Sequence, residues 1–159
     1  MSDPRADELL HLGETGDDAP GWVDVEARLG IRLPTVFKLM AQQFGDHRWN
    51  DFAFILNPLD PPYFSRIEGL LDAERELRSH FPGESVFPLH PEPGGLLPWA
   101  ATDNGDTLFF LTRSPHEPWP TIIKGARGPD LSVHFMPCNL ILRLIARGEL
   151  TSSWLPPTR

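Results

Sequence analysis

The pattern of apolar positions between residues 20 and 45 predicts two amphipathic helices. Each segment begins at a proline and ends at a glycine, Pro20 to Gly30 and Pro34 to Gly45. Proline is typical of the first turn of a helix, and glycine of its end. Apolar side chains recur with helical spacing in both segments: Trp22, Val25 and Leu29, then Val36, Phe37, Met40 and Phe44. With Leu33-Pro34 as the joint, we expect a helical hairpin with one apolar side.

Two apolar runs in the second half of the chain predict a β-hairpin. Residues 96–102 and 107–112 flank Asn104-Gly105, a dipeptide that favours the two-residue type I′ turn. That turn would pair Trp99 with Phe110, Ala101 with Leu108, and Asp103 with Asp106. Like charges directly opposite each other destabilise a β-ladder. The tip therefore either presents carboxylates to a partner or is a solvated polar turn.

The remaining apolar runs complete the predicted fold. Strands are expected at 52–56, 86–89, 121–123 and 131–135. Helical spacing predicts a middle helix from Ser65, in a capping box with Glu68, to about His80, and a last helix from Leu140 to Gly148. This is an α+β fold with a mostly antiparallel sheet of about five to six strands, an N-terminal helical hairpin, a middle helix and a C-terminal helix. The 96–112 hairpin should lie near the centre of the sheet.

Composition points to one domain without a membrane segment. The chain has 159 residues, of which 40% are hydrophobic and 23% charged, and a single core suits this length. No apolar run approaches the roughly 20 residues that cross a bilayer, and the N-terminus is acidic rather than basic. These features predict a cytoplasmic protein with no membrane partner. The one cysteine, Cys138, excludes an internal disulfide and is expected to be buried.

The net charge of −8 is concentrated at the N-terminus. Residues 1–26 hold eight acidic residues and one basic residue, Arg5, whereas the remainder is nearly neutral. No cluster of Lys and Arg could neutralise a run of phosphates, so nucleic acid is not an expected partner. We expect residues 1–19 to be an acidic, frayed leader and residues 20–159 to be one domain. The leader could meet a basic partner or simply keep the chain solvated.

Known catalytic and metal-binding spacings are absent. The sequence contains no HExxH, GxSxG, P-loop glycine pattern or CxxC. His90 and Glu92 are the nearest pair of metal ligands, but a zinc site needs three or four. Asp103 and Asp106 offer too few oxygens for a calcium site. We therefore predict no enzymatic activity, no cofactor and no metal.

The order and the amino-acid sequences of several segments resemble those of the SUKH superfamily, which includes Smi/Knr-type yeast cell-wall-synthesis regulators and bacterial toxin-immunity proteins. These segments are residues 22–26, 29–34, 37–45, 94–100 and 103–110, followed by the closing helix at 140–148. The leader and residues 57–84 lie outside the resemblance. It implies a binding protein that neutralises a cognate toxin, often a nuclease, by direct contact. The yeast members imply an alternative, a regulatory or scaffold module without a toxin partner.

Five residues are candidates for partner binding. Asp103, Asn104 and Asp106 form the predicted hairpin tip, whose carboxylates could mimic phosphates toward a basic nuclease cleft. Trp119 lies between prolines on a predicted loop, and tryptophan is frequent at interface hot spots. Glu92 lies beside the Gly94-Gly95 turn. The expected structural core contains Trp22, Leu33, Pro34, Phe44, Gly95, Trp99, Leu108 and Phe110.

Overall fold

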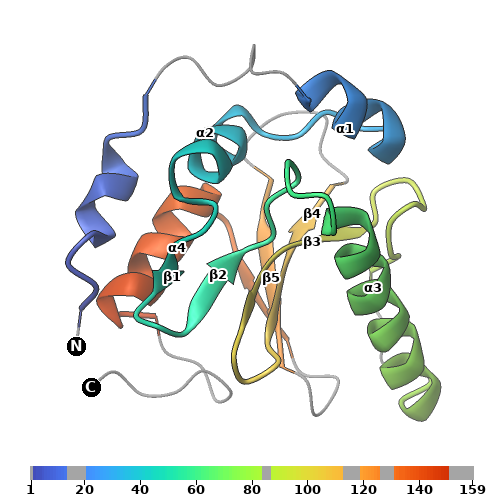
Figure 1. Ribbon diagram of the computed structural model, residues 1–159. Helices are drawn as coiled ribbons and strands as arrows, with labels where there is room; N and C mark the ends of the chain where they lie inside the picture. The colour runs from blue at the N-terminus through green and yellow to red at the C-terminus, as the bar shows by residue number, and fades with distance from the viewer. Residues whose placement is uncertain (1, 14–20, 84–86, 113–118, 126–130, 151–159) are drawn as a thin grey trace.

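The protein has an α+β fold in which helices cover both faces of one sheet (Figure 1). A computed structural model describes residues 2–13, 21–83, 87–112, 119–125 and 131–150. Helices α2 and α4 lie on one side of the sheet and α3 lies on the other (Figure 1). The predicted fold class is confirmed, with a six-stranded antiparallel sheet, two N-terminal helices, a middle helix and a C-terminal helix.

Each strand of the sheet pairs with the next strand along the chain, so the strand order is β1-β2-β3-β4-β5-β6. The strands are β1 Arg48–Trp49, β2 Ala53–Ile55, β3 Leu96–Thr102, β4 Thr107–Leu111, β5 Thr121–Lys124 and β6 Leu131–His134. β3 and β4 are central and buried along their whole length. The strand expected at 86–89 is not formed, because Leu89 makes only an isolated bridge to Leu96 and residue 86 lies outside the described residues.

The four α-helices are α1 Trp22–Leu29, α2 Thr35–Phe44, α3 Tyr63–His80 and α4 Cys138–Arg147. Gly30 ends α1 in the left-handed region, as the sequence predicts. α1 and α2 are tied by Glu26, whose carboxylate accepts the Leu33 backbone N–H at 2.6 Å and pairs with the buried Lys38 ammonium at 2.9 Å. α3 is tied to β5 in a similar way, since Glu74 pairs with Lys124.

The capping box predicted at Ser65 and Glu68 is wrong. α3 begins at Tyr63, so Ser65 lies inside the first turn. Its hydroxyl donates to the carbonyl of Pro62 at 2.9 Å instead of capping a backbone N–H. Serine in the first turns of a helix often makes such a local bond to a preceding carbonyl.

The β3–β4 hairpin differs from its predicted register. Gly105 N–H donates to the Thr102 carbonyl at 3.0 Å, and Thr102 N–H donates to the Asp106 carbonyl at 3.0 Å. Only Gly105, at φ 87°, is left-handed in this turn. The result is a three-residue loop, a type I turn followed by a left-handed glycine. A bulge between Pro98 and Ala100 shifts the register further.

Consequently the three predicted cross-strand pairs are wrong. Phe110 lies opposite Leu97, Leu108 lies opposite Ala100, and Asp103 does not face Asp106. A turn with two left-handed residues does occur, but between β1 and β2, where Asn50 and Asp51 have φ of 54° and 56°.

The bulge nevertheless brings the Trp99 and Phe110 rings together. They stack with centroids 5.3 Å apart and an interplanar angle of 16°, and Phe37 of α2 meets both rings edge-on. All eight residues expected in the core are buried: Trp22, Leu33, Pro34, Phe44, Gly95, Trp99, Leu108 and Phe110. A smaller cluster lies under α3 and includes Leu71, Leu96, Phe109 and Ile122.

The N-terminal segment is not frayed over residues 2–13. A short 3-10 helix, η1 Ala6–Leu10, buries Ala6 and Leu9, which share one face because they are three residues apart. The Asn139 side chain donates to the Leu9 carbonyl at 3.0 Å, and Asp7 pairs with Arg143 at 2.8 Å. The segment is therefore docked on α4, whereas the rest of the predicted leader, residues 14–19, lies outside the described residues.

Candidate partner-binding surface

The hairpin tip and the β1–β2 turn lie side by side at one end of the sheet (Figure 1). The Asp103 backbone N–H donates to the Phe52 carbonyl at 3.0 Å, and the Asp103 carboxylate pairs with Arg48. Arg48 also lies 4.0 Å from Asp51 and 5.2 Å above the Phe54 ring. The hydrogen bond that Arg48 donates to the Asp103 carboxylate raises the pKa of Arg48, so its guanidinium stays charged. The tip thus presents a mixed surface in which Arg48 offsets two carboxylates.

Asp106 does not belong to this exposed surface. Its side chain is only 2% exposed, and its carboxylate accepts a hydrogen bond from Thr102 Oγ1 at 2.8 Å. Burial raises the pKa of Asp106, and the Thr102 hydrogen bond opposes part of that rise. The residue fixes the turn rather than presenting a charge outward, which corrects its assignment as an outward carboxylate.

The other candidates are dispersed. Asn104 is exposed beside Asp103 at the tip. Glu92 is also exposed but precedes β3, at the end opposite the tip, and its carboxylate accepts the Leu89 N–H at 3.3 Å. Trp119 is 8% exposed and packs edge-on against Phe110 with centroids 5.5 Å apart. It is a core residue, so Asp103 and Asn104 are the two candidates that share an exposed surface.

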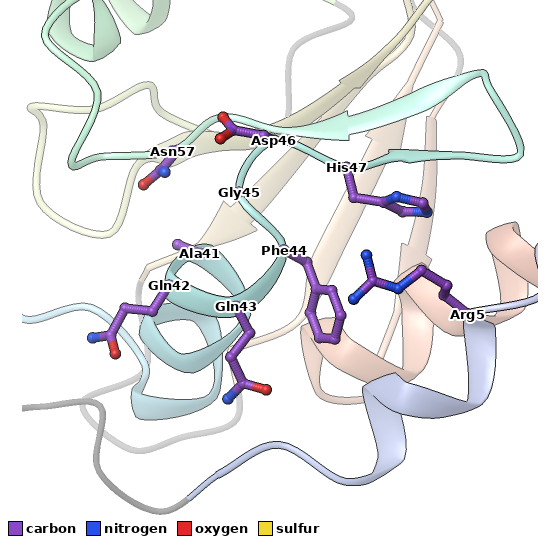
Figure 2. A pocket seen from close by; sticks show the side chains of 9 residues that line it. All are labelled: Arg5, Ala41, Gln42, Gln43, Phe44, Gly45, Asp46, His47 and Asn57. Atoms are coloured by element: carbon purple, nitrogen blue, oxygen red, sulfur yellow. The ribbon is translucent and has the colours of Figure 1, made fainter.

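A polar hollow of about 340 Å³, which the sequence did not suggest, lies at the C-terminal end of α2 (Figure 2). Its lining comes from three parts of the chain: the last turn of α2 with the following residues to His47, Arg5 at the start of η1, and Asn57 after β2. Figure 2 shows Asn57 to the left of Gly45 and Arg5 and His47 to its right, with Asp46 above it.

The two basic side chains at the hollow, Arg5 and His47, already contact carboxylates. The Arg5 guanidinium donates two hydrogen bonds to the Glu8 carboxylate, at 2.8 and 3.2 Å, and lies 4.8 Å above the Phe44 ring. His47 Nε2 lies 3.0 Å from the buried Asp3 carboxylate.

Asp3 joins the N-terminal segment to the β1 edge of the sheet. Burial alone would raise the pKa of Asp3, but backbone N–H groups of Arg5 and Asn50 and the His47 ring outweigh it and lower the pKa. The two backbone bonds are 2.8 and 2.9 Å long. Sequence reasoning missed this network because its members are far apart along the chain. Only Asn50-Asp51 carried a usable signal, since Asn and Asp favour turns with left-handed residues.

Within the described ranges, no three His, Cys, Asp or Glu side chains gather as ligands for a metal ion. The helices that the structure describes also include none with the length and apolar character needed to span a bilayer. A scan against models of protein families found no match, and neither the curated proteins nor the solved structures gave a significant match.

Proposed function

We propose that this protein is a non-enzymatic binding protein of the SUKH type that acts in the cytoplasm as an immunity protein. In this role it binds a cognate toxin domain directly and blocks its activity. One observation carries the proposal: separate segments of the resemblance converge on a single core. Phe37, Trp99 and Phe110 come from three of those segments and form one aromatic cluster, with rings 5.3 to 6.1 Å apart.

In the segments that resemble the SUKH superfamily, the buried side chains build the scaffold. Recognition of a partner is then left to exposed side chains. Trp22 and Leu33, from two further segments, are 1% and 3% exposed. A scaffold of this kind can serve many partners, because the partner is selected by the exposed residues. This division between a buried scaffold and an exposed surface supports a binding protein rather than an enzyme, in which the residues shared with the superfamily would form a reaction centre.

The charge of the chain favours a basic partner. The sequence carries a net charge of −8, and Asp46 and Asp103 are exposed near the β1 edge of the sheet. A nuclease domain has a basic cleft because it binds phosphates. Opposite charges on the two proteins would accelerate their association by electrostatic steering. A cognate nuclease toxin therefore has the surface that best complements this chain.

The test is neutralisation of a toxin encoded beside this gene. The toxin domain is expressed under an inducible promoter, alone, with this chain, and with an unrelated acidic protein of similar size as control. We expect growth to be rescued by this chain only, and the purified toxin to be inhibited at one equivalent. Rescue by the acidic control as well, or absence of a one-to-one complex, would contradict the proposal.

The regulatory alternative predicts a different outcome. A Smi/Knr-type module would leave toxin activity unchanged, and deletion of its gene would alter growth in cells that encode no toxin. The same strains, compared with and without the toxin gene, separate the two functions.

A further inference from the structure

We propose that the hollow at the C-terminal end of α2 receives a basic side chain of the partner, with the guanidinium or ammonium group held beside Asp46. This inference deepens the proposed function and rests on it for the identity of the partner. The preference for an organic cation follows from the residues of the hollow itself (Figure 2).

The end of α2 differs from the ends of the other α-helices that the structure describes. α1, α3 and α4 each carry a basic residue in the last turn, whereas α2 carries none. The last carbonyl groups of a helix lack intrahelical donors and carry a partial negative charge, which a cation stabilises. α1 and α4 also end in left-handed glycines whose N–H groups return to the helix, but Gly45 ends α2 in the right-handed region at φ −57°. The C-terminus of α2 is therefore the one best suited to an external cation.

Asp46 adds a formal negative charge at this place. Its side chain is exposed, it directly follows Gly45, and it forms no ion pair with any residue in the described ranges. The basic side chains nearby do not compensate it, because Arg5 contacts Glu8 and His47 contacts Asp3. Among the residues that line the hollow, Asp46 is the charged side chain without an ion pair in the described ranges, so its negative charge is not balanced within the hollow.

The shape of the hollow depends on Gly45. A Cβ atom at this position would overlap both the side chain of Asn57 and the carbonyl of Ala41. The wall formed by Asn57 can therefore lie directly against the end of α2. A guanidinium carries five N–H donors and an ammonium three, so either can satisfy several carbonyl and carboxylate oxygens at once. A single uncommitted carboxylate suits such a cation better than a metal ion, which needs several converging ligands.

The test is a titration of the full chain with N-acetyl-L-arginine amide, followed through backbone amide shifts. N-acetyl-L-citrulline amide, which has nearly the same shape without the charge, is the matched probe. We expect saturable shifts at residues 45–47 with the arginine probe and at least tenfold weaker binding of the citrulline probe. Asp46→Asn should weaken arginine binding severalfold. Asp24→Asn, which removes an exposed carboxylate from α1, should leave it unchanged.

Three results would overturn the inference: equal binding of both probes, shifts that do not saturate or that spread over the whole surface, and arginine binding unaffected by Asp46→Asn. The titration needs no partner, so its outcome is separate from the neutralisation experiment. Arginine binding at residues 45–47 without toxin neutralisation would overturn the proposed function and not the cation preference. Neutralisation with no arginine binding would overturn this inference and leave the proposed function standing.

Discussion

Thr102 and Asp106 hydrogen-bond to each other through their side chains across the base of the β3–β4 hairpin. Thr102 Oγ1 donates to Asp106 Oδ2 at 2.8 Å, and the Asp106 backbone N–H returns a longer bond of 3.3 Å to Thr102 Oγ1. Both residues are buried, at 4% and 2% exposure. This pair closes the three-residue turn. The Asp106 carboxylate, which the predicted register placed opposite Asp103, therefore has a structural role.

The first prediction concerns Asp106→Asn. Burial raises the pKa of Asp106 above its usual value of 3.8, so the folded state favours the protonated form. The stability this gives is fully present below pH 3.8 and is lost as the pH rises through the folded pKa. Asparagine stays neutral and still accepts the Thr102 hydrogen bond. The variant should therefore be at least as stable as the wild type at pH 7, with that advantage gone near pH 3.

Urea unfolding at the two pH values measures this difference. Thr102→Val is the companion variant, because it removes the donor and leaves the Asp106 carboxylate buried without it. At pH 7 it should cost about 1–3 kcal/mol. An Asp106→Asn variant that is clearly less stable than the wild type at pH 7 would show that the turn needs the charged form.

Sequence patterns predicted the large elements of this fold, but they did not predict the strand register, which single contacts determine. The helices α1, α2 and α4 and the central hairpin follow from proline and glycine positions and from apolar spacing. The hairpin register did not follow, because it is set by the bulge beside Trp99 and by the Thr102–Asp106 hydrogen bond, which neither apolar spacing nor the Asn-Gly signal reveals. β1 was missed because it is two residues long, which is too short for any periodicity.

The N-terminal segment gives the second prediction. Leu9 is fully buried against the core and Leu10 is 44% exposed, so the two neighbours form a matched pair. Leu9→Ala should reduce the free energy of unfolding by about 2–5 kcal/mol because it leaves a cavity. Leu10→Ala should change it by less than about 0.5 kcal/mol. Equal small effects in a denaturant titration would mean that the segment is frayed in solution.

The third prediction is a pH dependence from Asp3. Burial opposes ionisation of Asp3, but its hydrogen bonds outweigh burial and lower the pKa below 3.8. The stabilisation is therefore present above pH 3.8 and is lost as the pH falls through the folded pKa. Asp3→Asn should cost about 1.5–3 kcal/mol at pH 7, since it weakens hydrogen bonds to a charged group. The gap from the wild type should close in unfolding experiments at progressively lower pH.

Asp7→Asn is the control for that experiment. Asp7 is exposed, and its ion pair with Arg143 is partly open to solvent, where such pairs contribute little. A difference between Asp3→Asn and the wild type that stays constant with pH would show that the Asp3 charge does not stabilise the docked segment.

The fourth prediction separates core from interface for two tryptophans. Trp99 stacks on Phe110, and Trp119 packs on the same ring from another side. Trp99→Ala and Trp119→Ala should each reduce the free energy of unfolding by about 3–5 kcal/mol, as expected for a buried aromatic side chain. Thermal and denaturant unfolding measure this loss. A Trp119→Ala variant of normal stability that binds a partner more weakly would return Trp119 to the interface.

The candidate site was less predictable than the fold. Asp103 and Asn104 could be selected as an exposed tip because a polar turn between two strands projects from the sheet. The hollow at α2 could not be selected, since Arg5, Asp46 and Asn57 are brought together only by the docking of η1 and by the path of the chain after β2. Surfaces assembled from distant segments leave no periodic signal in one sequence.

The last prediction tests the tip as part of the interface. Asp103 is the acidic residue of the predicted tip that stays exposed, with half of its side chain accessible and Arg48 as its partner. If the tip approaches a basic partner, Asp103→Asn should slow association at low salt and flatten its salt dependence, because it removes an attractive charge. Arg48→Gln removes the offsetting positive charge and should have the opposite effect on the association rate.

The measurement is the association rate of each variant with the toxin domain at low and high salt. Both substitutions affect one solvent-exposed ion pair, so stability should change little, and rate changes report on the interface rather than on folding. The opposite signs of the two effects are the decisive feature, because a general loss of structure would slow both variants. Identical rates and salt slopes for wild type and both variants would place the binding surface elsewhere, with α3, which lies outside the resemblance, as the next segment to test.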